Sequence, residues 1–335
     1  MSIVMTGGGT GGHLAIIRAV KEQLKNENLI YIGSIKGQDK QWFGEDEGFR
    51  AKYFLSTQGV INQGILGKIK SLWMLGKATK TAMGLLKKHD AKVVFSVGGF
   101  SSAATAFAAK ILHIPLVIHE QNAAIGSLNR LLKPFAASFI SSYLQESPIK
   151  AYPVKEIFFE NARVRQNVKS ILFLGGSQGA KAINALALKI APELQKRGIR
   201  IIHQAGEKNL DEVKKAYEAL GIEAEVFGFT MKLAEYMKEA DLAIARAGAS
   251  TLWELSATGL PALFIPYPYA AGDHQYYNAK FLAEQNLAWL MRENEISEEK
   301  VIALLDEDMD IKSQGLQHMV EKDGSRQIAQ LLLQF

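Results

Sequence analysis

Short, continuous apolar runs recur along the chain, and a longer segment with helical spacing follows each of them. Examples are IVMT, LIYIG, KVVFSVG and LVIHE in the first half, and SILFLGG, IRIIHQAG, DLAIARAG and ALFIPY in the second half. Strands that are apolar throughout, rather than alternately apolar and polar, are typical of parallel sheets covered by helices on both faces. The pattern therefore predicts an α/β fold.

One segment breaks this rhythm. Residues 146–167, ESPIKAYPVKEIFFENARVRQN, contain two prolines and mixed charge, and a new strand, glycine turn and helix begin at Ser170. We predict two Rossmann-like domains whose parallel sheets face an interdomain cleft, since open α/β sheets bind ligands at the carboxyl ends of their strands. The expected parts are an N-terminal domain at 1–150, a linker at 151–168, a C-terminal domain at 169–316, and a final helix at 317–335 that can pack back on the N-terminal domain.

Four glycine-rich turns stand between a predicted strand and a predicted helix. IVMTGGGTGGHLAIIRAV resembles SILFLGGSQGAKAINALAL, and SVGGFSSAATAF and IARAGASTLWEL have the same form. The amino end of a helix presents unpaired N–H groups and the positive end of the helix dipole, which can hold an anion or a sugar oxygen. Two such ends facing one cleft suit a diphosphate-linked ligand. The structural alternative is that the glycines only allow a tight turn.

The first turn, residues 7–12, also fits the G-x-G-x-x-G pattern of NAD-binding domains. Such a domain needs an acidic residue after its second strand to bind the ribose, but LIYIG is followed by no acid until Asp39. No lysine followed by Ser or Thr closes either main glycine run, which disfavours a phosphate-binding P-loop. An NAD-dependent oxidoreductase is therefore a distant alternative.

The composition limits the class of protein and the cellular compartment. The 335 residues are 48% hydrophobic, enough for two cores, and the chain has no cysteine, which excludes disulfides and thiolate metal sites and favours the cytoplasm. Residues 93–109 carry no charge, but the central turn SVGGFSS favours a strand and a helix over a membrane span. The early glycines argue against a secretory signal.

The positive charge is concentrated. The net charge is +5, and between Gly48 and His89 there are eight Lys or Arg and no acid. We expect the membrane-facing residues to be Ile65, Leu66, Lys68, Ile69, Leu72 and Trp73. This composition predicts peripheral, salt-sensitive binding to an anionic membrane. The alternatives are a core-facing helix with a solvated basic side and a nucleic-acid surface, which the lack of interleaved aromatic residues disfavours.

Four motifs in this order carry a resemblance that covers nearly the whole chain: GGGTGGH, HEQN (119–122), GGSQGA (175–180) and RAGASTLWE (246–254). The chain resembles the bacterial peptidoglycan glycosyltransferases that convert lipid I (undecaprenyl-pyrophosphoryl-N-acetylmuramoyl-pentapeptide) to lipid II. The resemblance implies a two-domain GT-B fold, with the lipid acceptor on the N-terminal domain and UDP-N-acetylglucosamine (UDP-GlcNAc) on the C-terminal domain. It also implies an enzyme on the cytoplasmic side of the cell membrane.

The resemblance also implies site residues. It assigns donor contacts to Thr10, Gly11, Gly12, Asn122, Lys155, Ser177, Phe229, Thr230, Ala249, Ser250, Thr251, Leu252, Trp253, Glu254 and Gln275. Asn122 would contact the sugar hydroxyls and Ser177 the diphosphate. The backbone at Phe229 would face the uracil, and Glu254 would bind the ribose.

Two of these assignments carry a reservation. The family usually has Asn-Pro-Val-Arg where this chain has Tyr152-Pro153-Val154-Lys155, and lysine is a point charge that cannot make the two-pronged contact of arginine. Thr251 and Glu254 also fit a capping box, in which the carboxylate only caps a helix.

The implied reaction is an inverting β1,4 transfer. The helix dipole favours a neutral His13, which makes it the candidate base, with His119 and Glu120 as fallbacks. Helix ends can stabilise the leaving UDP, so no metal cofactor is expected; Asp306, Asp308 and Asp310 are interpreted as solvated surface. The alternatives are another GT-B transferase with a different acceptor and a non-catalytic nucleotide-sugar sensor.

Overall fold

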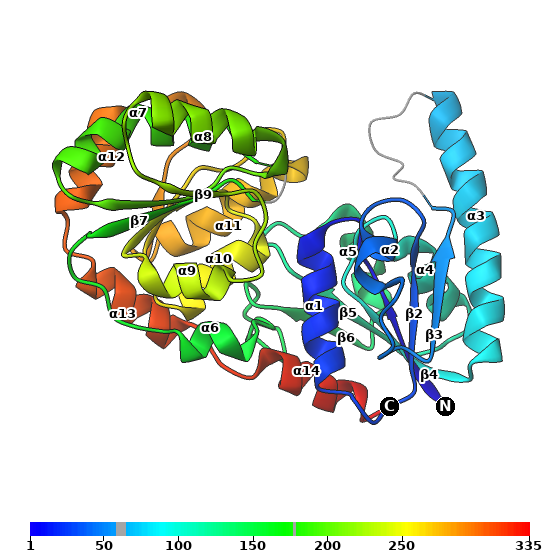
Figure 1. Cartoon of the computed structure of the whole chain (residues 1–335). Helices are drawn as coiled ribbons and strands as arrows, with labels where there is room; N and C mark the ends of the chain where they lie inside the picture. Colours follow the sequence, from blue (N-terminus) through cyan, green and yellow to red (C-terminus); the bar gives the residue numbers. More distant parts are fainter. Residues whose placement is uncertain (58–64, 177–178) are drawn as a thin grey trace. The chain divides into compact units, whose positions relative to one another are not determined.

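Each apolar run quoted above forms an inner strand of one of two parallel sheets (Figure 1). The computed structural model describes residues 1–57, 65–176 and 179–335, without the side chains of residues 65–70. These residues divide into two units, of which the first is Met1–Val154 with Lys322–Phe335 and the second is Lys155–Glu321. Each unit contains one sheet, so the predicted α/β fold is confirmed.

The first unit has the parallel strand order β3-β2-β1-β4-β5-β6. Its strands are β1 (Ser2–Thr6), β2 (Leu29–Ser34), β3 (Ala51–Leu55), β4 (Ala91–Ser96), β5 (Leu116–Glu120) and β6 (Ser138–Ser141). Its helices are α1 (Gly11–Glu22), α2 (Asp39–Phe43), α3 (Ile65–Lys88), α4 (Ala103–Ile111), α5 (Ser127–Leu132), the 3₁₀ turn η1 (Lys133–Phe135) and, near the C-terminus, α14 (Gly324–Leu332).

The second unit has the order β12-β11-β10-β7-β8-β9, which is the same topology with β7 in the place of β1. Its strands are β7 (Ser170–Leu174), β8 (Arg200–Gln204), β9 (Glu225–Phe227), β10 (Leu242–Ala245), β11 (Ala262–Phe264) and β12 (Trp289–Leu290). Its α-helices are α6 (Glu156–Glu160), α7 (Lys181–Lys196), α8 (Leu210–Ala219), α9 (Leu233–Glu239), α10 (Ala249–Ala257), α11 (His274–Ala283), α12 (Glu298–Ala303) and α13 (Asp310–Met319). The 3₁₀ turns are η2 (Glu207–Asn209), η3 (Ala271–Asp273), η4 (Glu293–Glu295) and η5 (Leu304–Asp306).

The inner strands are mainly apolar because both faces of each sheet are covered. On one face of the first sheet, Val4 belongs to a buried cluster with Ala82 of α3 and Ala104 of α4. Ile3 and Met5, which point to the opposite face by strand alternation, are also fully buried. Each such side chain contributes about 1.5–3 kcal/mol to stability, which explains why apolar residues occupy both faces of these strands.

In each unit, two glycine turns lie at the point where the strand order changes direction. These switch points lie between β1 and β4 in the first unit and between β7 and β10 in the second. Open α/β sheets bind ligands at such points, at the carboxyl ends of the strands. The glycines at 7–9 follow β1, those at 98–99 follow β4, those at 175–176 follow β7, and Gly248 follows β10. The four predicted glycine turns thus form two pairs, one pair in each unit.

The chain passes between the units twice. It leaves the first unit after Val154, within the segment expected to be a linker, and returns to it at Lys322, later than the expected start of the final helix at residue 317. Within the first unit, α14 packs against α1 and buries Ile328 and Leu332.

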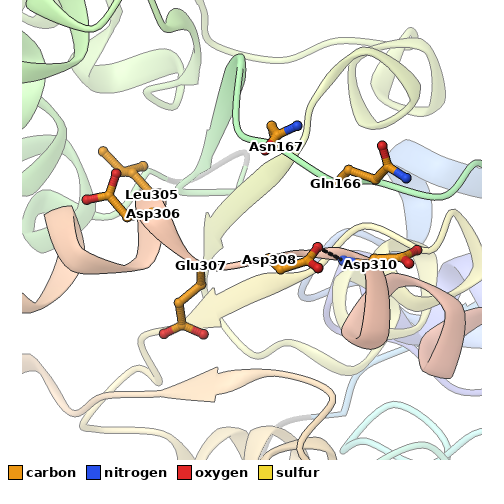
Figure 2. Close-up of a pocket in the computed structure, with 7 residues that line it drawn as sticks. All are labelled: Gln166, Asn167, Leu305, Asp306, Glu307, Asp308 and Asp310. Carbon is orange, nitrogen blue, oxygen red and sulfur yellow. Dashed lines mark hydrogen bonds between the residues drawn. The ribbon is translucent and has the colours of Figure 1, made fainter.

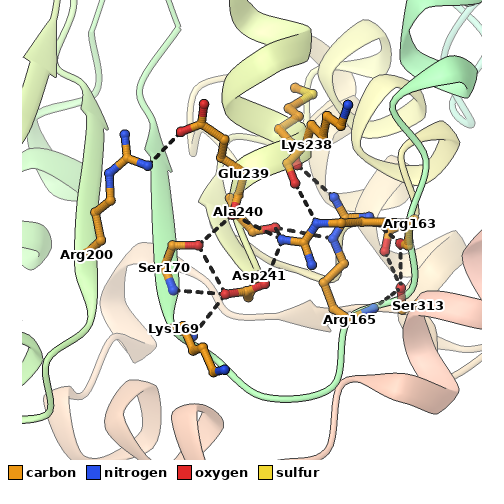
Figure 3. A network of polar contacts seen from close by, with 12 residues as sticks. Arg163, Arg165, Lys169, Ser170, Arg200, Lys238, Glu239, Ala240, Asp241 and Ser313 are labelled. Atoms are coloured by element: carbon orange, nitrogen blue, oxygen red, sulfur yellow. Dashed lines mark hydrogen bonds and ion pairs between the residues drawn. The ribbon is translucent and has the colours of Figure 1, made fainter.

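A buried arginine fixes the start of the second unit (Figure 3). The fully buried Arg165 side chain donates hydrogen bonds to the carbonyl oxygens of Met237 and Ala240 at the end of α9, and of Thr258 at the end of α10. A cation is favourable at helix C-termini. Burial, and then the charge of Arg163, lower the pKa of Arg165 to about 9, so the guanidinium stays charged at neutral pH. This contact anchors α10, whose other end carries predicted site residues.

Candidate active site

The first glycine turn leads directly to His13, the third residue of α1. The Thr10 hydroxyl lies 2.8 Å from His13 Nδ1, and a Cβ built on Gly99 would lie 3.5 Å from His13 Nε2. The same Cβ would lie 2.6 Å from the Gly8 carbonyl oxygen. The turns after β1 and β4 therefore touch, and His13 lies beside both of them.

One backbone N–H of this turn does not point outward as the anion-binding interpretation expects. The Gly9 N–H donates to the buried Asp39 carboxylate at 2.7 Å. Sequence reasoning treated Asp39 only as an acid too distant for an NAD site. The structure instead places it behind the glycine turn, a role for which the sequence carries no recognised spacing.

The residues at the end of β5 organise a loop. The buried Glu120 carboxylate accepts hydrogen bonds from the backbone N–H groups of Asn122 at 3.0 Å and Gly126 at 2.9 Å, and from the Asn129 side chain at 2.9 Å. His119 is fully buried, and burial, with a further effect from His13, lowers its pKa to about 3. Glu120 therefore holds the loop together and places Asn122 at the carboxyl end of the sheet. Within the described residues, neither ring nitrogen of the buried His119 has a hydrogen-bond partner.

The second unit presents the amino end of α10 at its switch point. The N-cap residue is Gly248, so Thr251 lies inside the helix and the predicted Thr251–Glu254 capping box is wrong. The helix starts earlier because Gly248 adopts the extended backbone of an N-cap. Ala249, Ser250 and Thr251 form the first turn, followed by the buried Leu252 and Trp253.

Glu254 has an unusual environment. Burial raises the pKa of the Glu254 carboxyl to about 8, although the positive charge of Lys155 opposes this. Lys155 is the N-cap residue of α6, which packs against α10. The packing of α6 against α10 therefore lets the charge of Lys155 affect the pKa of Glu254, although the two residues are far apart in sequence.

Gln275 lies in the first turn of α11 and faces the loop after β11. Its Oε1 accepts a hydrogen bond from the Tyr267 backbone N–H at 2.9 Å. Sequence reasoning missed Arg246, which follows β10: it donates to the carbonyl oxygens of Ile265 at 3.0 Å and Pro266 at 3.1 Å and pairs with Glu293. Arg246 ties the loop after β10 to the loop after β11.

The predicted uracil contacts lie in the loop after β9. Phe229 is 58% exposed there, and the Thr230 hydroxyl accepts a hydrogen bond from the Lys232 N–H at 3.0 Å, which closes a tight turn. Ser177, the predicted diphosphate contact, lies outside the described residues.

The predicted membrane helix is α3. Its residues Leu72 and Trp73 are 57% and 69% exposed, whereas the side chains of Ile65, Leu66, Lys68 and Ile69 lie outside the described part of the chain. Sequence reasoning missed further exposed apolar side chains of the first unit, namely Ile111, Leu131 and Phe135. The Lys110 Nζ atom lies 3.3 Å from the centre of the Phe135 ring. In the described ranges, no helix is long and apolar enough to span a bilayer.

A cavity of about 510 Å³ lies elsewhere in the second unit (Figure 2). It is lined by Gln166, Asn167, Leu305, Asp306, Glu307, Asp308 and Asp310. Gln166 and Asn167 precede β7, so the cavity is at the amino end of that strand and not near the glycine turns. Asp306 pairs with Arg197 at 2.7 Å, and the described residues contain no cluster of three or more His, Asp or Glu suited to a metal ion.

Comparisons with known proteins identify the family. Residues 3–141 match the glycosyltransferase family 28 N-terminal domain, and residues 170–332 match the C-terminal domain of that family. The chain is 75% identical over 332 residues to the UDP-N-acetylglucosamine--N-acetylmuramyl-(pentapeptide) pyrophosphoryl-undecaprenol N-acetylglucosamine transferase of Sulfurovum sp. (strain NBC37-1), which covers 99% of this chain and 98% of that protein. The Wolinella succinogenes protein of the same description is 54% identical over 335 residues, covering 99% of this chain and 100% of that protein.

A solved structure gives the same result. The crystal structure of Acinetobacter baumannii MurG matches with a TM-score of 0.80 and 26% identity, over 100% of this chain and 99% of that one. The chain therefore belongs to glycosyltransferase family 28, among the N-acetylglucosamine transferases with the GT-B fold.

Proposed function

We propose that this chain transfers N-acetylglucosamine from UDP-GlcNAc to the C4 hydroxyl of N-acetylmuramic acid in lipid I, and so makes lipid II for peptidoglycan synthesis. The observation that carries the proposal is the 75% identity to the Sulfurovum transferase, which extends over 98% of that protein. The paired glycine turns at both switch points support it, because they are where each sheet can hold a substrate.

The second unit would hold the donor. The first turn of α10, Ala249–Thr251, would receive the diphosphate at the positive end of the helix, together with Ser177. Glu254 would bind the ribose, the backbone at Phe229 and Thr230 would face the uracil, and Gln275 would complete the donor pocket. Because helix ends stabilise the two charges that develop on the leaving UDP, this scheme needs no metal ion.

The first unit would hold the acceptor. His13 would accept the proton of the C4 hydroxyl as that oxygen attacks the anomeric carbon from the face opposite UDP. Thr10, through its contact with His13 Nδ1 at 2.8 Å, would hold the imidazole in place, and Gly11, Gly12 and Asn122 would contact the donor sugar. Inversion at the anomeric carbon would give the β1,4 bond.

The lipid acceptor would be reached by peripheral binding at the cytoplasmic face of the inner membrane. The exposed Leu72 and Trp73 of α3 support this proposal, as do the exposed Ile111 and Phe135 with Lys110 beside them. Apolar side chains flanked by lysines suit an anionic interface, where each lysine contributes about 1 kcal/mol.

The experiment is incubation of the full chain with radiolabelled UDP-GlcNAc and lipid I in detergent micelles. We expect a labelled lipid product whose disaccharide has a β1,4 bond. Transfer to other acceptors, but not to lipid I, would identify a different GT-B transferase. Binding of UDP-GlcNAc without any transfer would contradict the enzymatic proposal and favour a nucleotide-sugar sensor.

A further inference from the structure

A buried carboxylate lies directly behind the first glycine turn. Asp39, the first residue of α2, is fully buried. Its Oδ2 accepts a hydrogen bond from the Gly9 N–H at 2.7 Å, and its Oδ1 accepts one from the Ser34 N–H at 3.0 Å. An ionised carboxylate only accepts hydrogen bonds, so donors from two segments hold it in one orientation.

Tyr31 ties the same carboxylate to the start of the turn. Its fully buried hydroxyl lies 2.8 Å from the Gly7 carbonyl oxygen and 3.0 Å from Asp39 Oδ1. Burial raises the pKa of the Tyr31 phenol, and the charge of Asp39 raises it further. The phenol therefore keeps its proton and remains a donor between the turn and the carboxylate.

The glycine turn packs so closely on its neighbours that it leaves no room for a side chain. A Cβ on Gly8 would lie 2.5 Å from Asp39 Oδ1, and a Cβ on Gly9 would lie 2.7 Å from the Phe100 ring. Gly9 also has a φ of 84°, which glycine adopts at low cost. Contacts from behind thus fix the backbone from Gly7 to Gly9, immediately before Thr10.

We propose that Asp39 and Tyr31 are positioning residues, which fix the first glycine turn so that Thr10 holds His13 toward the acceptor hydroxyl. The proposal rests on the proposed function, in which His13 is the proton acceptor. The Gly9 N–H already donates to the Asp39 carboxylate and is therefore not available to a ligand.

The test compares Asp39→Asn and Tyr31→Phe with a matched control, Asp46→Asn. Asp46 is also an acid of the first unit that accepts from a glycine N–H, that of Gly48 at 2.9 Å, but it pairs with Lys21 near the far end of α1. Each variant is assayed for lipid II formation at a temperature where melting curves show it to be folded. UDP binding is measured by calorimetry.

We expect Asp39→Asn and Tyr31→Phe to lower kcat on the order of 10- to 100-fold, the scale of a small misplacement of a catalytic group. The affinity for UDP, which lacks the sugar, should change less than about twofold, as should all parameters of Asp46→Asn. A folded Asp39 or Tyr31 variant with wild-type kcat, or one that loses UDP affinity in step with kcat, would overturn the proposal. If Asp39→Asn does not fold, Tyr31→Phe decides.

A second readout needs no catalysis. The imidazole resonance of His13 in the NMR spectrum should shift in Asp39→Asn and Tyr31→Phe but not in Asp46→Asn. An unchanged His13 resonance in the folded variants would overturn the positioning role. If the wild-type protein makes no lipid II, the proposed function fails, and the resonance still decides whether Asp39 positions His13.

Discussion

Burial and local donors, rather than residue type, decide what each ionisable side chain near the strand ends can do. His119 is buried in β5 with a pKa of about 3, so it stays neutral and is a poor proton acceptor. Glu120 is also buried, but hydrogen bonds from Asn122, Gly126 and Asn129 satisfy its carboxylate. Asp39 and Tyr31 show the limit of sequence reasoning at this scale. Their partners Gly7 and Gly9 lie in the turn after β1, whereas Tyr31 lies in β2 and Asp39 in α2, so only the folded sheet reveals the contact.

Replacement of His13 by alanine tests the proposed base. We expect His13→Ala to lower kcat about 10²- to 10⁴-fold, the usual contribution of a general base, because no side chain then accepts the proton of the acceptor hydroxyl. UDP affinity should be unchanged, since the second unit would hold the donor. Steady-state kinetics and calorimetry measure the two quantities. His318→Ala, at an exposed position of α13, is the control; equal activity of both variants would remove His13 from the chemistry.

Glu254 makes stability depend on pH. Its pKa in the folded protein is about 8, against an ordinary value of 4.5, so the folded state favours the protonated form. Its stabilising effect is complete below pH 4.5 and is lost as the pH rises through 8. Glu254→Gln should therefore become more stable than the wild-type protein between pH 5 and 9, by about 1.4 kcal/mol per unit of raised pKa. Denaturant unfolding at several pH values measures this. The exposed Glu212→Gln should show no such trend, and a Glu254→Gln curve parallel to that of the wild-type protein would contradict the expectation.

At the scale of elements, the inner strands were predictable and the edge strands were not. The runs that read as strands form β1, β2, β4 and β5 of the first sheet, and β7, β8, β10 and β11 of the second. The edges β3, β6, β9 and β12 are shorter or only partly buried. An edge strand has a neighbour on one side only, so less of its sequence must be apolar. The predicted helix end at Ala249–Thr251 is confirmed as the start of α10, and only the alternative capping box of Thr251 and Glu254 is wrong, because the N-cap is Gly248.

The close contact between the turns after β1 and β4 can be tested with one methyl group. A Cβ on Gly99, which has a φ of 79°, would lie 2.6 Å from the Gly8 carbonyl oxygen. We expect Gly99→Ala to cost about 2–4 kcal/mol of unfolding free energy through strain and overpacking, and to lower kcat because His13 lies beside both turns. Gly84→Ala, in α3 with nothing within 4 Å of the new Cβ, should instead stabilise by roughly 0.5–1 kcal/mol. Chemical denaturation of both variants gives the comparison, and equal effects would refute the close contact.

At the scale of the whole molecule, the chain builds the same six-stranded topology twice. The repeated strand and glycine pattern made two domains predictable, and the break near residues 146–167 indicated where the first one ends. The return of residues 322–335 to the first unit was only a possibility in the sequence, because an amphipathic helix does not reveal which apolar surface it will cover. Membrane association also belongs to this scale, since it depends on exposed residues from separate helices.

Membrane binding should depend on the exposed Trp73 of α3. Trp73→Glu would place a negative charge where a 69% exposed aromatic side chain stands, and we expect it to weaken co-sedimentation with anionic lipid vesicles about tenfold, since burying Trp is favourable and acids are repelled. Added salt should also weaken the binding of the wild-type protein to these vesicles. Ile311→Glu, at a 74% exposed position in the second unit, is the control. If both variants bind vesicles like the wild-type protein, α3 is not the membrane surface.

The most direct test of the central claim, that the glycine-built switch points hold the two halves of one transfer reaction, is a crystal structure of the full chain with UDP-GlcNAc. The account predicts the diphosphate at the first turn of α10, the uracil against the backbone of Phe229 and Thr230, and His13 on the face of the sugar opposite UDP. A nucleotide bound away from α10, or a diphosphate seated on the first glycine turn in front of Asp39, would contradict it.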